Sequence, residues 1–351
     1  MVLMKPSPTF FPTSLGYGDI ARIEKIAAAI GVLNGAVFRG FGHESWYMRA
    51  CWMGYARALQ LQAIELDEID VISWGCAVPI PGRARHDTLV DPFGAFREWQ
   101  VSLGLAGGRH WREDLPFSPT LPPAFSEAPI VLRAIAIVCQ YAAARPHIQA
   151  WLSLPILLHR MGITAAPLPC LVAGDKGARF GTRDPDAVVS RVLRDLAHSA
   201  TDAVAMLAQI EADRRRWIEV LAAERKPGAL RDLAALTMRQ PLFRPEPLAR
   251  QLGLSLSGAG KLLERAAALG FVTEISGRGS WRVYMIPDMA RRLGLAPMLR
   301  GRPAKPPPLP KRDPLGAQLA AFDAEMAALA ARFPHLKLGE ASDGEPGGSA
   351  T

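Results

Sequence analysis

Apolar residues recur every three or four positions through much of the first 225 residues, and this spacing predicts amphipathic helices. The longest pattern covers 186–225, and shorter helices are expected over 19–30, 45–67, 130–144 and 146–161. Loops rich in proline and glycine are expected at 76–95, 115–129 and 162–185. Alternation of the strand type is weak before residue 270. We therefore predict a mainly α fold, with an irregular leader at 1–18 and an α-helical domain of unknown function at 19–225.

A tighter pattern follows, in which two short helices flank a glycine turn. A helix over 228–240 is followed, after a proline, by a second helix that starts near Pro247. Gly253 supplies the left-handed residue of the turn, and Ser255 is a suitable N-cap for a third helix. Its expected buried residues are Ala259, Leu262, Leu263 and Ala266. The alternating stretch 272–285 then predicts a two-stranded wing, so residues 226–296 are predicted to form a winged helix-turn-helix.

Charge supports a polyanion as the partner of this element. The whole chain carries a net charge of +8, whereas residues 226–312 hold sixteen Lys or Arg and only five Asp or Glu. The excess positive charge is therefore confined to one quarter of the molecule, as expected of a nucleic-acid binder.

The third helix and the wing supply the predicted contacts with double-stranded DNA. The N-terminal half of this helix enters the major groove in such folds, while phosphates attract basic side chains. Residues predicted to bind DNA are Ser255, Leu256, Ser257, Gly258, Gly260, Lys261, Arg265, Arg278 and Arg282. Few of these side chains can make bidentate hydrogen bonds with a base. The two glycines favour close approach to the DNA backbone or relaxed specificity.

The C-terminal segments are predicted to be accessory to the DNA-binding element. Residues 297–316 form a basic, proline-rich linker, residues 317–334 an amphipathic helix, and residues 335–351 a disordered tail. Winged regulators gain affinity by presenting two recognition helices one duplex turn apart. We therefore expect a homodimer, formed through the helical domain or through the helix at 317–334.

Several classes of protein are disfavoured by the composition. The longest apolar stretch, from Ile130, is interrupted by Arg133 and is shorter than a bilayer span of about 20 residues. The four cysteines are scattered and form no C-x-x-C pair, which argues against a zinc site and fits reduced thiols. We expect a cytoplasmic protein that uses no membrane, metal or cofactor.

The motifs also resemble a known group of proteins. The stretch LLHRMGITAAPLPCL, a long arginine-bearing helix and SGRGSWRVYMI together resemble an uncharacterised alphaproteobacterial family, many of whose members are plasmid-borne. That rhizobial plasmid-type family joins a helical domain of unknown function to a C-terminal helix-turn-helix. The resemblance covers about residues 20–295 and implies DNA binding.

A more remote similarity is to Fic-type proteins that carry a winged-helix C-terminus, which implies a degenerate Fic-like helical bundle. Fic enzymes transfer a nucleotide with a loop of the form H-P-F-x-D/E-G-N-G-R. The matching stretch here, AAARPHIQAWLSLPILLHRMGI, contains His147 and Arg160 but lacks the acidic residue and the G-N-G turn. His147 is therefore interpreted as a histidine at the start of a helix, and no catalytic residue is predicted.

The sequence thus predicts a non-enzymatic DNA-binding protein that regulates transcription or maintains a replicon. Two alternatives remain: a Fic-like nucleotidyltransferase with a non-standard site, and an adaptor whose winged helix binds protein. The ligand or partner of the helical domain is left open.

Overall fold

The computed structural model describes residues 15–37, 43–80, 83, 91–105, 110–113, 115–180, 184–277 and 281–295, and a few positions between 320 and 332. The fold is mainly α, as predicted: 67% of the described residues are helical, and the described strands form one three-stranded sheet. The chain divides into two compact units, Met1–Pro297 and Met298–Thr351. In the second unit, the described positions between 320 and 332 are helical and exposed, and the expected apolar face of that helix lies outside the described residues.

The first part of the chain forms a helical body. Its helices are α1 (Tyr17–Val37), α2 (His43–Leu61), α3 (Glu68–Gly75), α4 (Gly94–Gly104), α5 (Ile130–Ala144), α6 (Ile148–Leu152), α7 (Leu154–Arg160) and α8 (Pro185–Ala223), with 3-10 turns at Pro123–Phe125 and Lys176–Phe180. The predicted bounds of α5 are confirmed, whereas the single helix expected at 146–161 is split at Ser153, just before Pro155. A proline in the first turn of a helix is well tolerated, so a new helix starts there.

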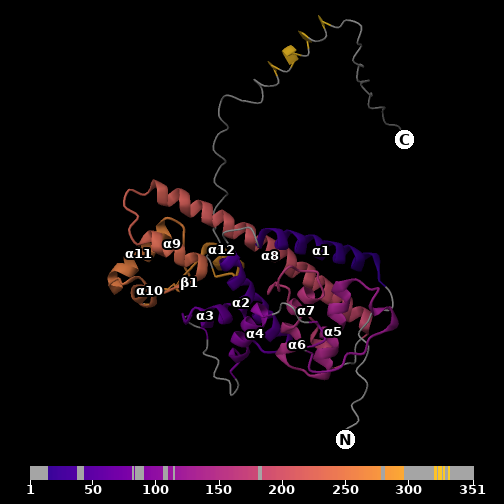
Figure 1. Cartoon of the computed structure of the whole chain (residues 1–351). Helices are drawn as coiled ribbons and strands as arrows, with labels where there is room; N and C mark the ends of the chain where they lie inside the picture. The colour runs from indigo at the N-terminus through magenta and orange to yellow at the C-terminus, as the bar shows by residue number, and fades with distance from the viewer. Residues whose placement is uncertain are drawn as a thin grey trace, which may run out of the picture. The chain divides into compact units, whose positions relative to one another are not determined.

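The longest described helix, α8, extends from the helical body to the second part of the chain (Figure 1). Asp184 caps it by accepting a hydrogen bond from the amide of Ala187 at 3.2 Å. Most of its predicted apolar stripe is buried, including Val189, Val192, Leu196 and Ile210, whereas Val204 and Leu221 are half-buried. Helix α1 packs along α8, so these two helices form one wall of the body.

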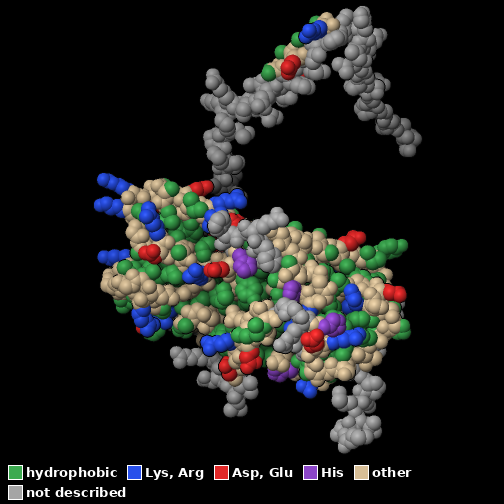
Figure 2. All heavy atoms as spheres, in the orientation of Figure 1, with side chains coloured by type: hydrophobic (Ala, Val, Ile, Leu, Met, Phe, Trp, Pro, Cys, Tyr) green, Lys and Arg blue, Asp and Glu red, His purple; other side chains and the backbone are tan. Residues whose placement is uncertain are grey.

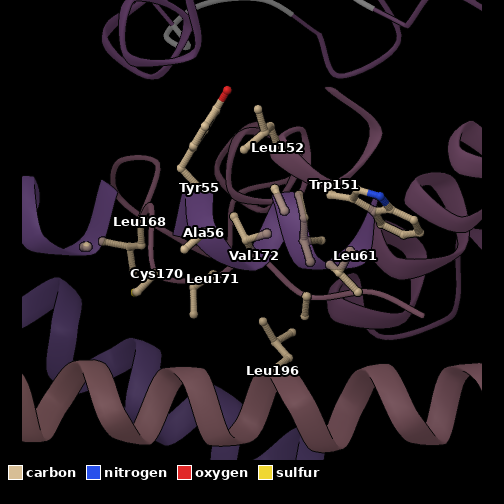
Figure 3. Packing of buried hydrophobic residues seen from close by; sticks show 14 of the residues in the cluster. Tyr55, Ala56, Leu61, Trp151, Leu152, Leu168, Cys170, Leu171, Val172 and Leu196 are labelled. Atoms are coloured by element: carbon tan, nitrogen blue, oxygen red, sulfur yellow. The ribbon is translucent and has the colours of Figure 1, made fainter. Parts of the chain in front are cut away.

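An irregular segment passes through the middle of the core instead of running over the surface. Figure 3 shows Leu168, Cys170, Leu171 and Val172 lying between α2 and the Leu196 face of α8. The segment passes so close to α2 that a β-carbon at Gly54 would lie 2.1 Å from the carbonyl oxygen of Pro169. Only glycine fits at this crossing, and burial of the segment makes it part of the core.

The second part of the chain follows the order helix, strand, helix, helix, strand, strand. Its elements are α9 (Leu230–Arg239), β1 (Leu242–Phe243), α10 (Pro245–Leu252), α11 (Leu256–Ala268), β2 (Thr273–Glu274) and β3 (Tyr284–Met285), followed by α12 (Pro287–Arg292). All pairs of the sheet are antiparallel in the order β1-β3-β2, with Leu242 opposite Met285 and Thr273 also opposite Met285. Three helices followed by a hairpin were expected here from the sequence, β1 was not, and we call residues 228–286 the winged part.

The sheet joins the winged part to the helical body. Successive residues of a strand point to opposite faces, and here both faces are buried. Phe243 and Tyr284 belong to the core of the winged part, whereas Leu242 and Met285 belong to the core of the helical body. The winged part is therefore packed on the body through a shared sheet.

Candidate nucleic-acid interface

The turn between α10 and α11 has the predicted geometry. Gly253 ends α10 in the left-handed conformation, with φ of +63°, which a β-carbon would disfavour. The backbone amide of Leu254 then donates to the carbonyl of Ala249 at 2.9 Å. The Ser255 hydroxyl caps α11 by accepting from the amide of Gly258 at 3.1 Å. The roles predicted for Gly253 and Ser255 are confirmed.

Helix α11 has one buried face and one face in solvent. The predicted inward residues Ala259, Leu262, Leu263 and Ala266 are buried. Of the predicted DNA-binding residues on this helix and its cap, Ser255, Leu256, Ser257, Lys261 and Arg265 are exposed, while Gly258 and Gly260 are half-buried. The side chain of Leu256 is 62% exposed, so an apolar group stands at the first turn of the helix.

The basic side chains predicted to contact DNA differ in whether a carboxylate of the same chain already pairs with them. Among the described residues, Lys261 forms no ion pair. Arg265 instead pairs with Glu224 and donates to the carbonyl of Lys226 at 3.2 Å. Arg282 pairs with Glu264 at 2.5 Å, and Arg278 lies outside the described residues. Two of the predicted phosphate contacts are thus already occupied by carboxylates of the same chain.

Arg282 is held by more than Glu264. Its pKa is raised by a hydrogen bond with the Tyr284 side chain, and further by the carboxylates of Glu264 and Glu274. Its Nε lies 4.0 Å from Glu274 of β2. Burial in turn raises the pKa of Tyr284, so this phenol stays protonated at neutral pH. Arg282 therefore ties the base of the wing to α11.

Three polar features of this surface were missed from the sequence. Glu264 lies on the solvent face of α11, and Glu224 neutralises Arg265 from the end of α8. At the wing, the guanidinium carbon of Arg244 lies 4.8 Å from the ring centroid of Trp281, whose side chain is 59% exposed. The position of Glu264 could have been found, because Ser257, Lys261 and Glu264 share one stripe of a helix.

Basic side chains nevertheless project from this end of the molecule. Figure 2 shows Lys and Arg on the surface where Figure 1 places α10, α11 and the C-terminal end of α8. The exposed residues include Arg225, Lys226, Arg231, Arg250 and Lys261. A polyanion approaching this surface would meet several cations outside the ion pairs of α11.

A buried ion pair fixes α12 to the helical body behind this surface. Arg49 of α2, 3% exposed, donates to Asp288 of α12 at 3.2 Å. Burial lowers the pKa of Arg49, against the opposing effect of Asp288. Nearby, burial raises the pKa of Asp213 on α8, and Asp288 raises it further. The pKa of Arg49 and the pKa of Asp213 therefore both depend on the charge of Asp288.

The helical body also contains a cavity of about 560 Å³ between α4, α5, α6 and α7. Its walls include Trp99, Trp111, Tyr141, Leu152 and Ile156, and its polar groups include Glu98, Gln149 and Arg160. Cavities of this size and mixed lining can hold a drug-sized molecule.

His147, which belongs to the stretch compared with Fic-type proteins, has a structural role. His147 is the N-cap of α6, and its Nδ1 accepts from the amide of Gln149 at 3.3 Å, as interpreted from the sequence. Burial raises the pKa of the Cys51 and Cys139 thiols to about 12, which favours the protonated thiol at neutral pH. No group of His, Cys, Asp or Glu with metal-binding geometry occurs among the described residues.

Searches find neither a protein-family model nor a curated protein that matches the chain. Within the described residues, no helix combines the length and apolar character needed to cross a bilayer.

Proposed function

We propose that the protein binds double-stranded DNA through α11 and the wing, and that it regulates transcription or maintains a replicon in the cytoplasm. The observation that supports this most is the exposed N-terminal half of α11, which carries Lys261 free of ion pairs within the described residues. A capped helix presented in this way can enter a major groove, and its positive N-terminal dipole favours phosphate.

The packing of the winged part on the helical body supports a role of that body in positioning α11 on DNA. The sheet shared with the helical body holds α11 in one orientation relative to α2 and α8. Two copies of such a rigid body could set two α11 helices about 34 Å apart, one turn of duplex, which is why we also propose a homodimer. Sedimentation of the protein with a duplex of about four helical turns would give the number of chains bound.

The test is the affinity of full-length protein for a labelled mixed-sequence duplex, measured by fluorescence anisotropy at several salt concentrations. We expect the logarithm of the affinity to fall linearly with the logarithm of salt concentration, because bound cations leave the phosphates. Lys261→Ala should weaken binding and reduce that slope by about 1.

A matched control is Lys25→Ala, which removes an equally exposed lysine from α1 of the helical body. It should leave affinity and slope unchanged. Equal losses in both variants would mean that net charge alone attracts DNA, and no retention of any duplex by the wild-type protein would reject the proposal.

A further inference from the structure

The solvent face of α11 carries an acidic residue where a DNA-binding helix would be expected to be basic. Ser257, Lys261 and Glu264 are exposed and follow one another at four- and three-residue spacing. This spacing sets them on one stripe, opposite the buried Ala259, Leu263 and Ala266. The proposed function places Lys261 at the duplex, and Glu264 follows Lys261 by about one turn on the same stripe, so a duplex that Lys261 reaches also comes close to Glu264.

Glu264 is both neutralised and oriented. Its Oε1 pairs with Nη1 of Arg282 at 2.5 Å, and Arg282 is itself held by Tyr284 and Glu274. Within the described residues Oε2 makes no hydrogen bond. A side chain with one oxygen anchored to the wing and the other free offers an acceptor in a fixed place. The neighbouring guanidinium also reduces its repulsion of phosphates.

A free carboxylate oxygen can discriminate between bases. It only accepts hydrogen bonds, and the base edges of the major groove that donate are the amino groups of cytosine and adenine. Adenine and guanine also present the N7 acceptor, which repels a carboxylate, whereas cytosine presents its amino donor alone. The chemistry of Glu264 therefore favours cytosine.

Lys261 extends this pattern to a second base. Glu264 lies three positions after Lys261, which places it about 4.5 Å further along the helix axis. Base pairs are stacked about 3.4 Å apart, so the two side chains reach positions one or two steps from each other. Lysine donates to O6 and N7 of guanine. A guanine near the cytosine would satisfy both residues.

We infer that Glu264 is a specificity-determining residue that accepts a hydrogen bond from cytosine N4, so that the preferred ligand is duplex DNA with a C·G pair under α11. This inference rests on the proposed function. Arg282 is the positioning residue of the pair, because it holds the carboxylate and contacts no base in this arrangement.

The experiment is selection of full-length protein on a pool of randomised duplexes, followed by sequencing, for the wild type and for Glu264→Gln. Glutamine can still accept from Arg282 with its amide oxygen, which preserves the tie to the wing, but the group that it then turns toward the duplex is an NH2 donor, which suits the acceptors N7 and O6 of guanine and not the amino group of cytosine. We expect a wild-type motif with cytosine at one position and, in the variant, guanine in place of cytosine at that position alone. Exchanging the base at that position should change the wild-type affinity roughly tenfold.

The matched control is Glu246→Gln, which neutralises an exposed glutamate of α10 that pairs with Arg250 at 3.9 Å. It should keep the cytosine. If Glu264→Gln fails to fold, as judged by circular dichroism, Glu264→Ala takes its place and should lose the preference at that single position while binding random duplex more tightly.

The outcomes distinguish a failure of this inference from a failure of the proposed function. The same motif in the wild type and Glu264→Gln would overturn the role of Glu264, as would salt-sensitive binding of all duplexes with no motif, and DNA binding would survive in either case. Failure of the wild type to retain any duplex would remove the proposed function and this inference together.

Discussion

The indole of Trp217 lies flat on the phenyl ring of Phe271, with ring centroids 3.2 Å apart and planes 4° from parallel. Trp217 belongs to the long helix α8, and Phe271 follows the end of α11. Both side chains are buried in the core of the winged part. The last turns of α8 therefore complete the core that supports α11, although they precede the predicted start of the DNA-binding element at residue 226.

Removing this ring should weaken the support of α11. Trp217→Ala is expected to lower the free energy of unfolding by about 3–5 kcal/mol, through lost burial and the cavity left behind. Urea unfolding followed by circular dichroism measures it. Trp281→Ala is the control, because that indole is 59% exposed and its contact with Arg244 contributes about 1 kcal/mol or less. Similar losses in the two variants would contradict the role of Trp217.

A second prediction concerns the charges at the junction of α2, α8 and α12. The pKa of Asp213 is raised above its ordinary value of 3.8, chiefly by burial. An acid whose folded-state pKa is raised adds stability that is fully present below its unfolded pKa and is lost as pH rises through the folded pKa. Above its folded-state pKa, ionised Asp213 therefore lowers stability relative to acidic pH.

Asp213→Asn should remove that cost. The amide oxygen can still accept from Gln209, which donates to Oδ1 of Asp213 at 2.9 Å. We expect a higher melting temperature than the wild type near pH 7, and a difference that shrinks as pH falls toward about 4. The control is Glu24→Gln at an exposed position inside α1, for which no ion pair occurs among the described residues and which should leave the melting temperature nearly unchanged at every pH. A lower melting temperature for Asp213→Asn at pH 7 would mean that attraction to Arg49 outweighs burial.

The sequence could predict the elements with strong local signals. The stripe of α8 and the capped turn at Gly253 and Ser255 each depend on residues close together in the chain. Weaker elements were missed: β1 has only two residues, and its strand character depends on pairing with β3, about forty residues later. Helix α3 was missed because the predicted helix ran on to Asp67, whose real role is to cap α3.

The exposure of the candidate DNA-binding residues could be predicted, whereas their ion pairs could not. The exposure of Lys261 and Arg265 follows from helical periodicity, which the sequence displays. The pairing of Arg265 with Glu224 joins residues forty-one positions apart, and only the return of the chain past the end of α8 creates it. Likewise the buried path of Leu168–Gly174 has no periodic signal, because its burial comes from α2 and α8 on either side.

A third prediction follows from that pairing. Arg265 is committed to Glu224 and to the carbonyl of Lys226, so Arg265→Ala should weaken DNA binding less than Lys261→Ala does. Glu224→Gln should strengthen DNA binding, because it removes a negative charge and releases Arg265 for a phosphate. The expected sign is a tighter complex with a salt slope steeper by up to about 1. Salt titrations of the three variants on one duplex measure it, and a weaker complex for Glu224→Gln would show that the ion pair itself shapes the interface.

The last prediction compares the glycine of the turn, Gly253, with a glycine inside α11, Gly260. Gly253 has a φ of +63°, and a β-carbon added there would meet no atom within 4 Å, so Gly253→Ala should cost about 1–2 kcal/mol for backbone strain alone. Gly260 lies inside α11 with equally open surroundings, so Gly260→Ala should stabilise the fold by about 1 kcal/mol, because alanine is the better helix former. Thermal melts should therefore move in opposite directions. If α11 approaches a duplex at Gly260, the added methyl group will also lower DNA affinity, so that this variant melts later and binds less tightly. Higher stability with unchanged affinity would move the contact along the helix, toward Ser257 and Lys261.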